Sequence, residues 1–241
     1  MEKTYFISVV LLFIYFMETI NTNTTFLIKK SEFDNRIIRK FVLEQVNNTE
    51  TVTTCVYRCV RDLNCVSFFY NQNQKRCQTN SVGFITPGDG EEESGTKYYS
   101  LYEEGCPADF IRNRNLDLCY KPYIETKDDD FGEARDLCVA NSYVLVRGKT
   151  TEDYKHISDQ LRASTDYASK KFWIDGSDSQ VEGVWKFDNG QKMTAFFWAQ
   201  GEPDNTTSGK DNVYLRKSSN GVYEMSDTQY YLDAYRICQV L

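Results

Sequence analysis

Four acidic residues near the carboxyl end of the chain could together hold a metal ion. Glu202 and Asp204 flank Pro203, and Asp211 and Asp227 follow within about 25 residues of Glu202. Ca²⁺ is a hard cation that takes oxygen ligands, so a loop with several carboxylates holds it without nitrogen or sulfur. We therefore expect a calcium site here. The alternative is a solvated acidic loop, which charged surface stretches usually are.

The sequence contains few residues that suggest a catalytic site. His156 is the only histidine, and no nucleophile lies near it in the sequence, so no Ser-His or Cys-His pair is evident. We expect His156 on a helix surface. Glu202 and Asp204 could be the paired carboxylates of a glycosidase, but two acids one residue apart fit metal ligation better. We expect no enzyme and no catalytic residue.

Two helices and several strands are expected to position the acidic residues. Helical spacing places these residues on buried faces: Phe131, Ala134, Leu137 and Cys138 in the first helix, and Tyr154, Ile157 and Leu161 in the second. Asp130 with Glu133, and Thr150 with Asp153, are typical of helix starts. Aromatic-rich strands separated by long loops are predicted at residues 173–176, 184–190, 197–198 and 235–238.

The first half of the chain predicts one helix against a small sheet. The helical face consists of Val52, Cys55, Val56, Cys59, Val60 and Leu63. Residues 66–70 are predicted as a strand, and the aromatic residues 98–102 as a closing strand. A helix stapled to a sheet by disulfides suits a domain with a thin core. Four cysteines, Cys55, Cys59, Cys65 and Cys77, allow three connectivities.

Composition and the amino-terminal residues indicate an extracellular protein. The even count of 8 cysteines favours disulfides, and the net charge of -7 argues against nucleic-acid binding. The apolar run 5–16 is too short for a membrane anchor, so residues 1–20 are expected to be a signal peptide of a secreted product. Asn23, Asn47 and Asn205 are expected glycosylation acceptors.

A Gly- and Glu-rich run, residues 88–95, separates two groups of cysteines. We place the domain boundary just after the closing strand, which gives domains at residues 27–103 and 104–241. The first domain resembles the PAN/Apple family through its Cys-x3-Cys-x5-Cys-x11-Cys spacing, with Ser67-Phe68 after the third cysteine. The resemblance implies the pairs Cys55–Cys77 and Cys59–Cys65. It implies a binding role for proteins or glycans, and the alternative is a stabilising spacer.

The second domain resembles the C-type lectin domain. The matching motifs, in order, are Trp173-Ile174-x-Gly176, Trp185-x3-Asn189-Gly190, Trp198-x2-Gly201-Glu202-Pro203 and Ile237-Cys238. The resemblance implies an α+β fold with two helices, antiparallel sheets and a long calcium loop, preceded by the small disulfide-stapled α+β domain. It also implies the disulfides Cys106–Cys119, of the long form of that domain, and Cys138–Cys238.

The resemblance implies the roles of individual loop residues. Glu202, Asp204, Asp211 and Asp227 would bind Ca²⁺, with a cis bond before Pro203 aiming two carboxylates at one ion. The same four residues and Ser226 would bind carbohydrate. Asp204 and Ser226 stand where the mannose-type site has asparagines, and an ionised Asp accepts hydrogen bonds but donates none. Sugar recognition is therefore less strongly implied than calcium binding.

Two functions on this scaffold remain distinct. One is a calcium-dependent, carbohydrate-binding secreted lectin that recognises glycans on microbial or host surfaces in innate recognition or adhesion. The alternative is a calcium-independent module for protein-protein interaction, because a fold alone does not fix a function. Partner proteins are also expected for the PAN/Apple-like domain, and neither nucleic acid nor a membrane anchor is expected.

Overall fold

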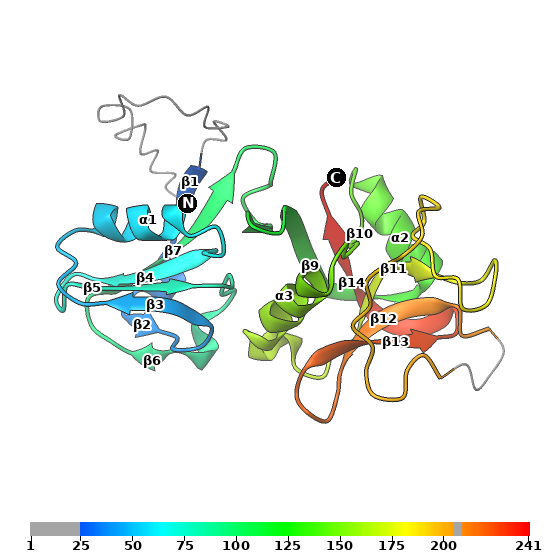
Figure 1. The fold of residues 1–241 in the computed structure, drawn as a ribbon. Coiled ribbons are helices and arrows are strands. Elements are labelled where there is room, and N and C mark those ends of the chain that lie inside the picture. Colours follow the sequence, from blue (N-terminus) through cyan, green and yellow to red (C-terminus); the bar gives the residue numbers. More distant parts are fainter. Residues whose placement is uncertain (1–24, 205–208) are drawn as a thin grey trace. The chain divides into compact units, whose positions relative to one another are not determined.

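The computed structural model describes residues 25–204 and 209–241. The expected signal peptide and the acceptors Asn23 and Asn205 lie outside the described residues. The chain forms two compact units (Figure 1): one comprises the described residues up to Gly83 together with Gly90–Asn115, and the other comprises Phe84–Asp89 together with Leu116–Leu241. The boundary expected from the sequence at residues 103 and 104 stays a proposal.

The first unit has a helix and an antiparallel sheet. Its elements are β1 (Thr25–Lys30), η2 (Ser31–Phe33), β2 (Arg36–Ile37), β3 (Val42–Val46), α1 (Val52–Arg61), β4 (Ser67–Asn71), β5 (Arg76–Asn80), β6 (Glu91–Glu92), β7 (Thr96–Glu103) and β8 (Ile111–Asn113). The main sheet has the order β1-β7-β4-β5-β3, and β2 pairs with β6. Strands β4 and β7 therefore confirm the two strands predicted from the sequence.

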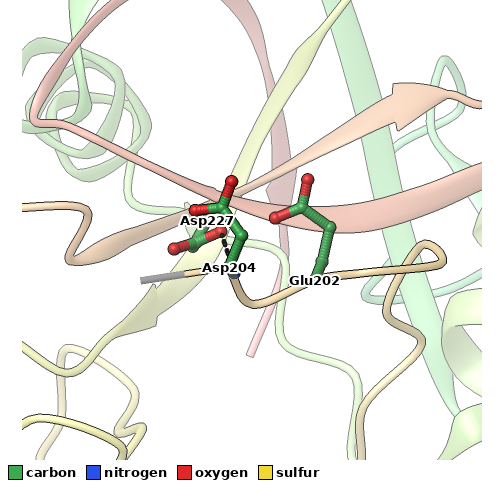
Figure 2. Close-up of side chains that lie close together, drawn as sticks. All are labelled: Glu202, Asp204 and Asp227. Carbon is green, nitrogen blue, oxygen red and sulfur yellow. Dashed lines mark hydrogen bonds between the residues drawn. The ribbon is translucent and has the colours of Figure 1, made fainter. Parts of the chain in front are cut away.

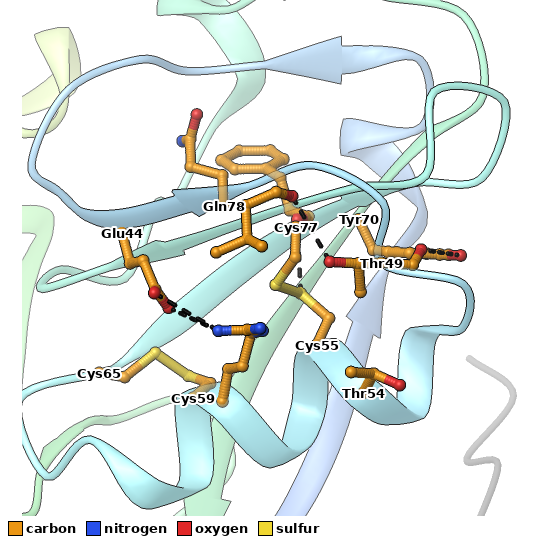
Figure 3. The surroundings of a disulfide bond; sticks show 12 residues. Glu44, Thr49, Thr54, Cys55, Cys59, Cys65, Tyr70, Cys77 and Gln78 are labelled. Carbon is orange, nitrogen blue, oxygen red and sulfur yellow. Dashed lines mark hydrogen bonds and ion pairs between the residues drawn. A yellow bond between two sulfur atoms is a disulfide. The ribbon is translucent and has the colours of Figure 1, made fainter.

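Disulfides fasten α1 to its surroundings (Figure 3). Thr51 caps the helix by accepting a hydrogen bond from the Thr54 backbone N–H at 3.2 Å. One turn apart on the buried face, Cys55 and Cys59 form disulfides with Cys77 on β5 and with Cys65, which confirms the implied pairing. The predicted face ends early, because the helix stops at Arg61 and Leu63 beyond it is exposed.

The second unit holds two helices and a mixed sheet. Its elements are η3 (Pro87–Asp89), β9 (Leu118–Asp130), α2 (Phe131–Ala140), β10 (Val144–Leu145), α3 (Thr151–Arg162), η4 (Thr165–Tyr167), β11 (Phe172–Ser177), β12 (Asn212–Lys217), β13 (Tyr223–Thr228) and β14 (Tyr231–Gln239). The sheet contains the order β13-β12-β11-β14-β9, with β10 paired to β14. Among the pairs of neighbouring strands described for this order, β11 and β14 run parallel and the others run antiparallel.

Helix starts and the long-range disulfide follow the sequence predictions. The Asp130 side chain caps α2 by accepting from the Glu133 N–H at 2.8 Å, and Thr150 forms a capping box with Asp153 at the start of α3. Cys138 on α2 is bonded to Cys238 on β14, as implied. The two remaining cysteines, Cys106 and Cys119, are also disulfide-bonded.

The core of the second unit joins α2 to four strands, β10, β11, β12 and β14. It contains Phe131, Ala134, Cys138, Leu145, Trp173, Tyr214, Ala234 and Cys238. Trp173 on β11 is fully buried and meets the Phe131 ring edge-on at 5.7 Å between centroids. Because β12 lies beside β11 in this sheet, the core fixes the strands from which the candidate site is built.

Two strand predictions are wrong. In the described structure, residues 184–190 and 197–198 do not form strands. They form only isolated β-bridges: Lys186 pairs with Ser177 and with Lys192, and Trp198 pairs with Met225. Their aromatic side chains pack against one another instead, with Trp185 and Trp198 at 5.2 Å between ring centroids.

Across the described residues, no helix combines the length and apolar character needed to cross a bilayer.

Candidate functional site

The carboxylate cluster, Glu202, Asp204 and Asp227, brings a loop and a strand together (Figure 2). One ligand atom from each residue lies within 4.8 Å of the others. The Glu202–Pro203 peptide bond is cis, as the resemblance implied. The Asp204 backbone N–H donates to Asp227 Oδ1 at 3.2 Å, which joins the loop directly to the strand residue.

Backbone hydrogen bonds hold the loop against β13. The Met225 N–H donates to the Phe197 carbonyl at 2.8 Å, and the Ala199 N–H donates to the Met225 carbonyl at 2.9 Å. The Glu202 N–H then donates to the Ala199 carbonyl at 3.0 Å. Since Asp227 lies two residues beyond Met225 on the same strand, these bonds bring Glu202 and Asp204 to the end of β13 that carries Asp227.

Burial differs across the cluster and determines its electrostatics. Asp227 is 3% exposed, whereas the Asp204 side chain is 33% exposed. Burial raises the pKa of Glu202, and the neighbouring Asp227 raises it further, while Arg216 opposes the shift. Glu202 Oε2 is buried and has no hydrogen-bond partner among the described residues. A buried carboxylate oxygen beside a second carboxylate is an arrangement that a bound cation stabilises.

Two basic side chains already contact the cluster. Lys210 forms an ion pair with Asp204 Oδ1, and this hydrogen bond raises the pKa of Lys210. On β12, Arg216 donates from Nη2 to Glu202 Oε1 at 3.0 Å and from Nε to Ser226 Oγ at 2.7 Å. Three carboxylates thus face two cations, which leaves one formal negative charge.

The two remaining predicted site residues lie elsewhere. Asp211 is not part of the group within 4.8 Å; its backbone carbonyl accepts the Asp178 N–H at 3.1 Å. Ser226 faces Tyr214 across the β12–β13 ladder, is fully buried, and accepts the Arg216 hydrogen bond. The structure therefore brings together Glu202, Asp204 and Asp227, and it leaves Ser226 with no exposed surface.

Lys210 and Arg216 are the residues that sequence reasoning missed. Lys210 directly precedes Asp211, so a basic residue within the acidic loop was a visible signal. Arg216 gave no such signal, because its approach to Glu202 depends on the register of β12 against β13. His156 also differs from expectation: it is 8% exposed and meets the Tyr120 ring edge-on at 5.9 Å between centroids.

The donor set fits Ca²⁺. Calcium accepts six to eight oxygen ligands, including carboxylates that bind through one or both oxygens. The cluster offers carboxylate oxygens alone, and Glu202 Oε2 is buried without a hydrogen bond to a described residue. Lys210 and Arg216 would compete with the ion for Asp204 and Glu202 respectively.

Comparisons with known proteins identify both parts of the chain. Residues 127–239 match the family model of the lectin C-type domain, and residues 30–106 match that of the PAN domain. Perlucin from Haliotis laevigata is 28% identical over 138 residues, which cover 56% of this chain and 83% of perlucin. Human C-type lectin domain family 4 member E is 35% identical over 74 residues, covering 30% of this chain and 34% of that protein.

Among solved structures, C-type lectin CEL-I from Cucumaria echinata is 22% identical, with a TM-score of 0.49, and the match covers 56% of this chain and 97% of that chain. The two family models describe a lectin domain and a PAN domain, and neither indicates an enzyme. The chain is therefore a C-type lectin domain protein with a PAN domain on the amino-terminal side.

Proposed function

We propose that the C-type lectin domain binds carbohydrate through a calcium ion held by Glu202, Asp204 and Asp227. The observation that supports this most strongly is the convergence of the three carboxylates within 4.8 Å, from a loop and a strand. When bound, the ion supplies a centre that coordinates neighbouring sugar hydroxyls. The proposal does not include Asp211, which lies outside the cluster, or Ser226, which is buried.

The protein's own groups would orient the sugar. Asp204 is the most exposed member of the cluster and accepts hydrogen bonds from hydroxyl groups at the rim. Lys210 lies beside it and can donate, so it replaces in part the amide donors expected of a mannose-type site. Arg216 donates to both Glu202 and Ser226, and it would release Glu202 when the ion binds.

Melting experiments with and without calcium test this proposal. A ligand that binds only the folded state raises the melting temperature by mass action. We expect the full chain to melt at a higher temperature with Ca²⁺ than with chelator, and to bind a glycan array only with Ca²⁺. Asp204→Ala should lose both effects, while Asp211→Ala should keep them. Melting that ignores calcium, together with an array signal that survives chelator, would exclude the proposal.

A calcium-independent binding module remains the second candidate function. Lys210 and Arg216 support it, because they neutralise two of the three carboxylates without a metal ion. This candidate predicts that partner proteins bind equally well with Ca²⁺ and with chelator. Binding of extracellular partners by the PAN domain belongs to the same proposal.

We also propose secretion and glycosylation for the chain. The support is that none of the 8 cysteines is free, which is typical of oxidising compartments. Asn47 is exposed in the structure, as a glycosylated side chain must be. Mass spectrometry of the protein from a secreting eukaryotic host, with and without enzymatic deglycosylation, tests occupancy at Asn47 directly.

A further inference from the structure

A pocket rich in basic residues lies at the ends of two neighbouring strands of the lectin-domain sheet, β11 and β12. It has a volume of about 320 Å³ and is lined by Ser169, Lys170, Lys171, Arg216, Lys217 and Ser218, which we call the basic pocket. Residues 169–171 precede β11, and residues 216–218 end the neighbouring strand β12. Four cations in one pocket contrast with the net charge of -7 of the whole chain.

Aromatic rings, not carboxylates, hold two of these lysines. Lys170 Nζ lies 4.5 Å from the Tyr235 ring centroid and 3.4 Å from its hydroxyl oxygen. Lys171 Nζ lies 5.7 Å from the Tyr214 ring centroid. A cation–π contact orients an ammonium group but leaves its full charge in place. Both lysines are thus positioned and remain able to bind an anion.

Ion pairs leave most of the pocket's charge uncompensated. Within the described part of the chain, Lys170, Lys171 and Lys217 form no ion pair. Two acidic groups contact other lining residues: Glu202 accepts from Arg216, and Glu224 accepts from the Ser218 hydroxyl. Ser218 is therefore already engaged, and the three lysines are the groups that an anion would meet.

Arg216 links the basic pocket to the carboxylate cluster. It lines the pocket and also donates to Glu202 and Ser226. A guanidinium carries five N–H donors, and these two contacts use only part of them. A glycan bound at the carboxylate cluster would therefore lie beside Arg216, a residue that also lines the basic pocket.

We propose that the basic pocket binds an oxyanion carried by a glycan, with a sulfate ester preferred over a carboxylate. Separate ammonium groups act as point charges that several oxygens of a tetrahedral anion can contact together, whereas a planar carboxylate suits the fork of a single arginine. The pocket itself stands without the carboxylate cluster. Only the assignment of a glycan as the carrier rests on the proposed function.

The test uses dextran probes that differ only in their substituent: dextran sulfate, dextran phosphate, carboxymethyl dextran and unmodified dextran. The full chain is measured in chelator, so that calcium plays no part. The pocket variant is Lys170→Gln, Lys171→Gln and Lys217→Gln combined. Its matched control removes three exposed lysines of the same unit that do not line the pocket: Lys127→Gln, Lys155→Gln and Lys192→Gln.

We expect the pocket variant to bind dextran sulfate at least about tenfold more weakly than the unmodified chain, since a hydrogen bond to a charged group contributes about that factor. The control variant should change affinity by less than about twofold, as expected for distant exposed charges. Inorganic sulfate should compete better than chloride at equal ionic strength. Lys217→Gln alone should give part of the loss, which covers the case in which the triple variant folds poorly.

The measured affinities distinguish anion binding at the basic pocket from its alternatives. The proposal that the basic pocket binds an anion is overturned by either of two results. The pocket and control variants could lose the same affinity, or unmodified dextran could bind as tightly as dextran sulfate. Carboxymethyl dextran binding as tightly as dextran sulfate supports an anion pocket but overturns the preference for sulfate. If calcium-dependent array binding fails while dextran sulfate binding still depends on the three lysines, the proposed function fails and the pocket stands.

Discussion

The carboxylate cluster and the basic pocket share Arg216 but are built on opposite principles. In the cluster, Lys210 and Arg216 pair with Asp204 and Glu202, so most of the charge is balanced within the protein. In the pocket, two lysines rest on tyrosine rings and keep their charge. The cluster must exchange a protein cation for a metal ion, whereas the pocket can take an anion without breaking an ion pair.

The largest expected effect is a loss of stability of the lectin domain at low pH, caused by His156. This loss sets the lower limit of the pH range in which calcium and anion binding can be compared. Burial lowers the pKa of His156 to about 4, below its ordinary value of 6.5. The unfolded chain therefore binds the proton first, and stability falls as the pH drops below 6.5 until it levels off below the folded pKa. Between pH 7 and pH 4, His156 alone lowers the free energy of unfolding by about 3 kcal/mol.

His156→Gln should remove this pH dependence. The free energy of unfolding is measured in urea at pH 7 and pH 4, by the fluorescence of the 3 tryptophans, Trp173, Trp185 and Trp198, all of which lie in the lectin unit. The variant should lose about 3 kcal/mol less than the unmodified chain between the two pH values. An equal loss in both proteins would contradict the neutral, buried state of His156.

The next effect separates the two regions by charge. Asp227→Asn removes a buried carboxylate from the cluster with little change in shape, so Ca²⁺ should bind on the order of 100-fold more weakly. Calorimetric titration with Ca²⁺ measures this. Dextran sulfate binding should stay unchanged, and Asp211→Asn, outside the cluster, is the matched control. If Asp211→Asn weakens calcium binding as much as Asp227→Asn, the ion lies elsewhere in the loop.

Arg216→Gln should move the two regions in opposite directions. The pocket loses a cation, so dextran sulfate should bind about fivefold more weakly. At the cluster, Glu202 loses the guanidinium that competes with a metal ion, so Ca²⁺ should bind more tightly. Lys217→Gln is the control, because it should weaken only anion binding. A parallel fall of both affinities would mean that Arg216 acts only as a support for β13.

The smallest effect is at the rim of the cluster. Lys210→Gln removes the ammonium group that pairs with Asp204, and Ca²⁺ affinity should rise roughly two- to fivefold, the range expected for a surface ion pair. Calcium titration measures the change, with Lys192→Gln as the control. Unchanged affinity would show that Lys210 does not compete with the ion.

Local patterns were sufficient to predict much of the fold. Capping residues Asp130 and Thr150 act within one turn of their partners, so the helix starts were visible in the sequence. The disulfides at α1 followed from the family resemblance and were confirmed. Strand β11 was also confirmed, because Trp173 and Ile174 are an aromatic and a β-branched residue that favour strands locally.

The features that could not be predicted from the sequence depend on contacts between residues far apart in the chain. Residues 184–190 have strand composition, but their aromatic side chains pack in a loop and pair only at isolated positions. His156 on α3 is buried and contacts Tyr120 on β9, a long-range contact that helical periodicity alone did not reveal. Likewise, Arg216 reaches Glu202 through strand register, and Asp211 has the right residue type and loop but lies outside the cluster.

The disulfide between Cys138 and Cys238 has a consequence for cleavage of the chain. It encloses Glu202, Asp204 and Asp227 within a covalent loop whose ends are 100 residues apart. A protease that cuts once in the segment between Asp204 and Asp211 would therefore produce two polypeptides that stay joined. The cut protein would migrate as one species on a non-reducing gel and as two fragments after reduction, with Glu202 and Asp204 on one fragment and Asp227 on the other.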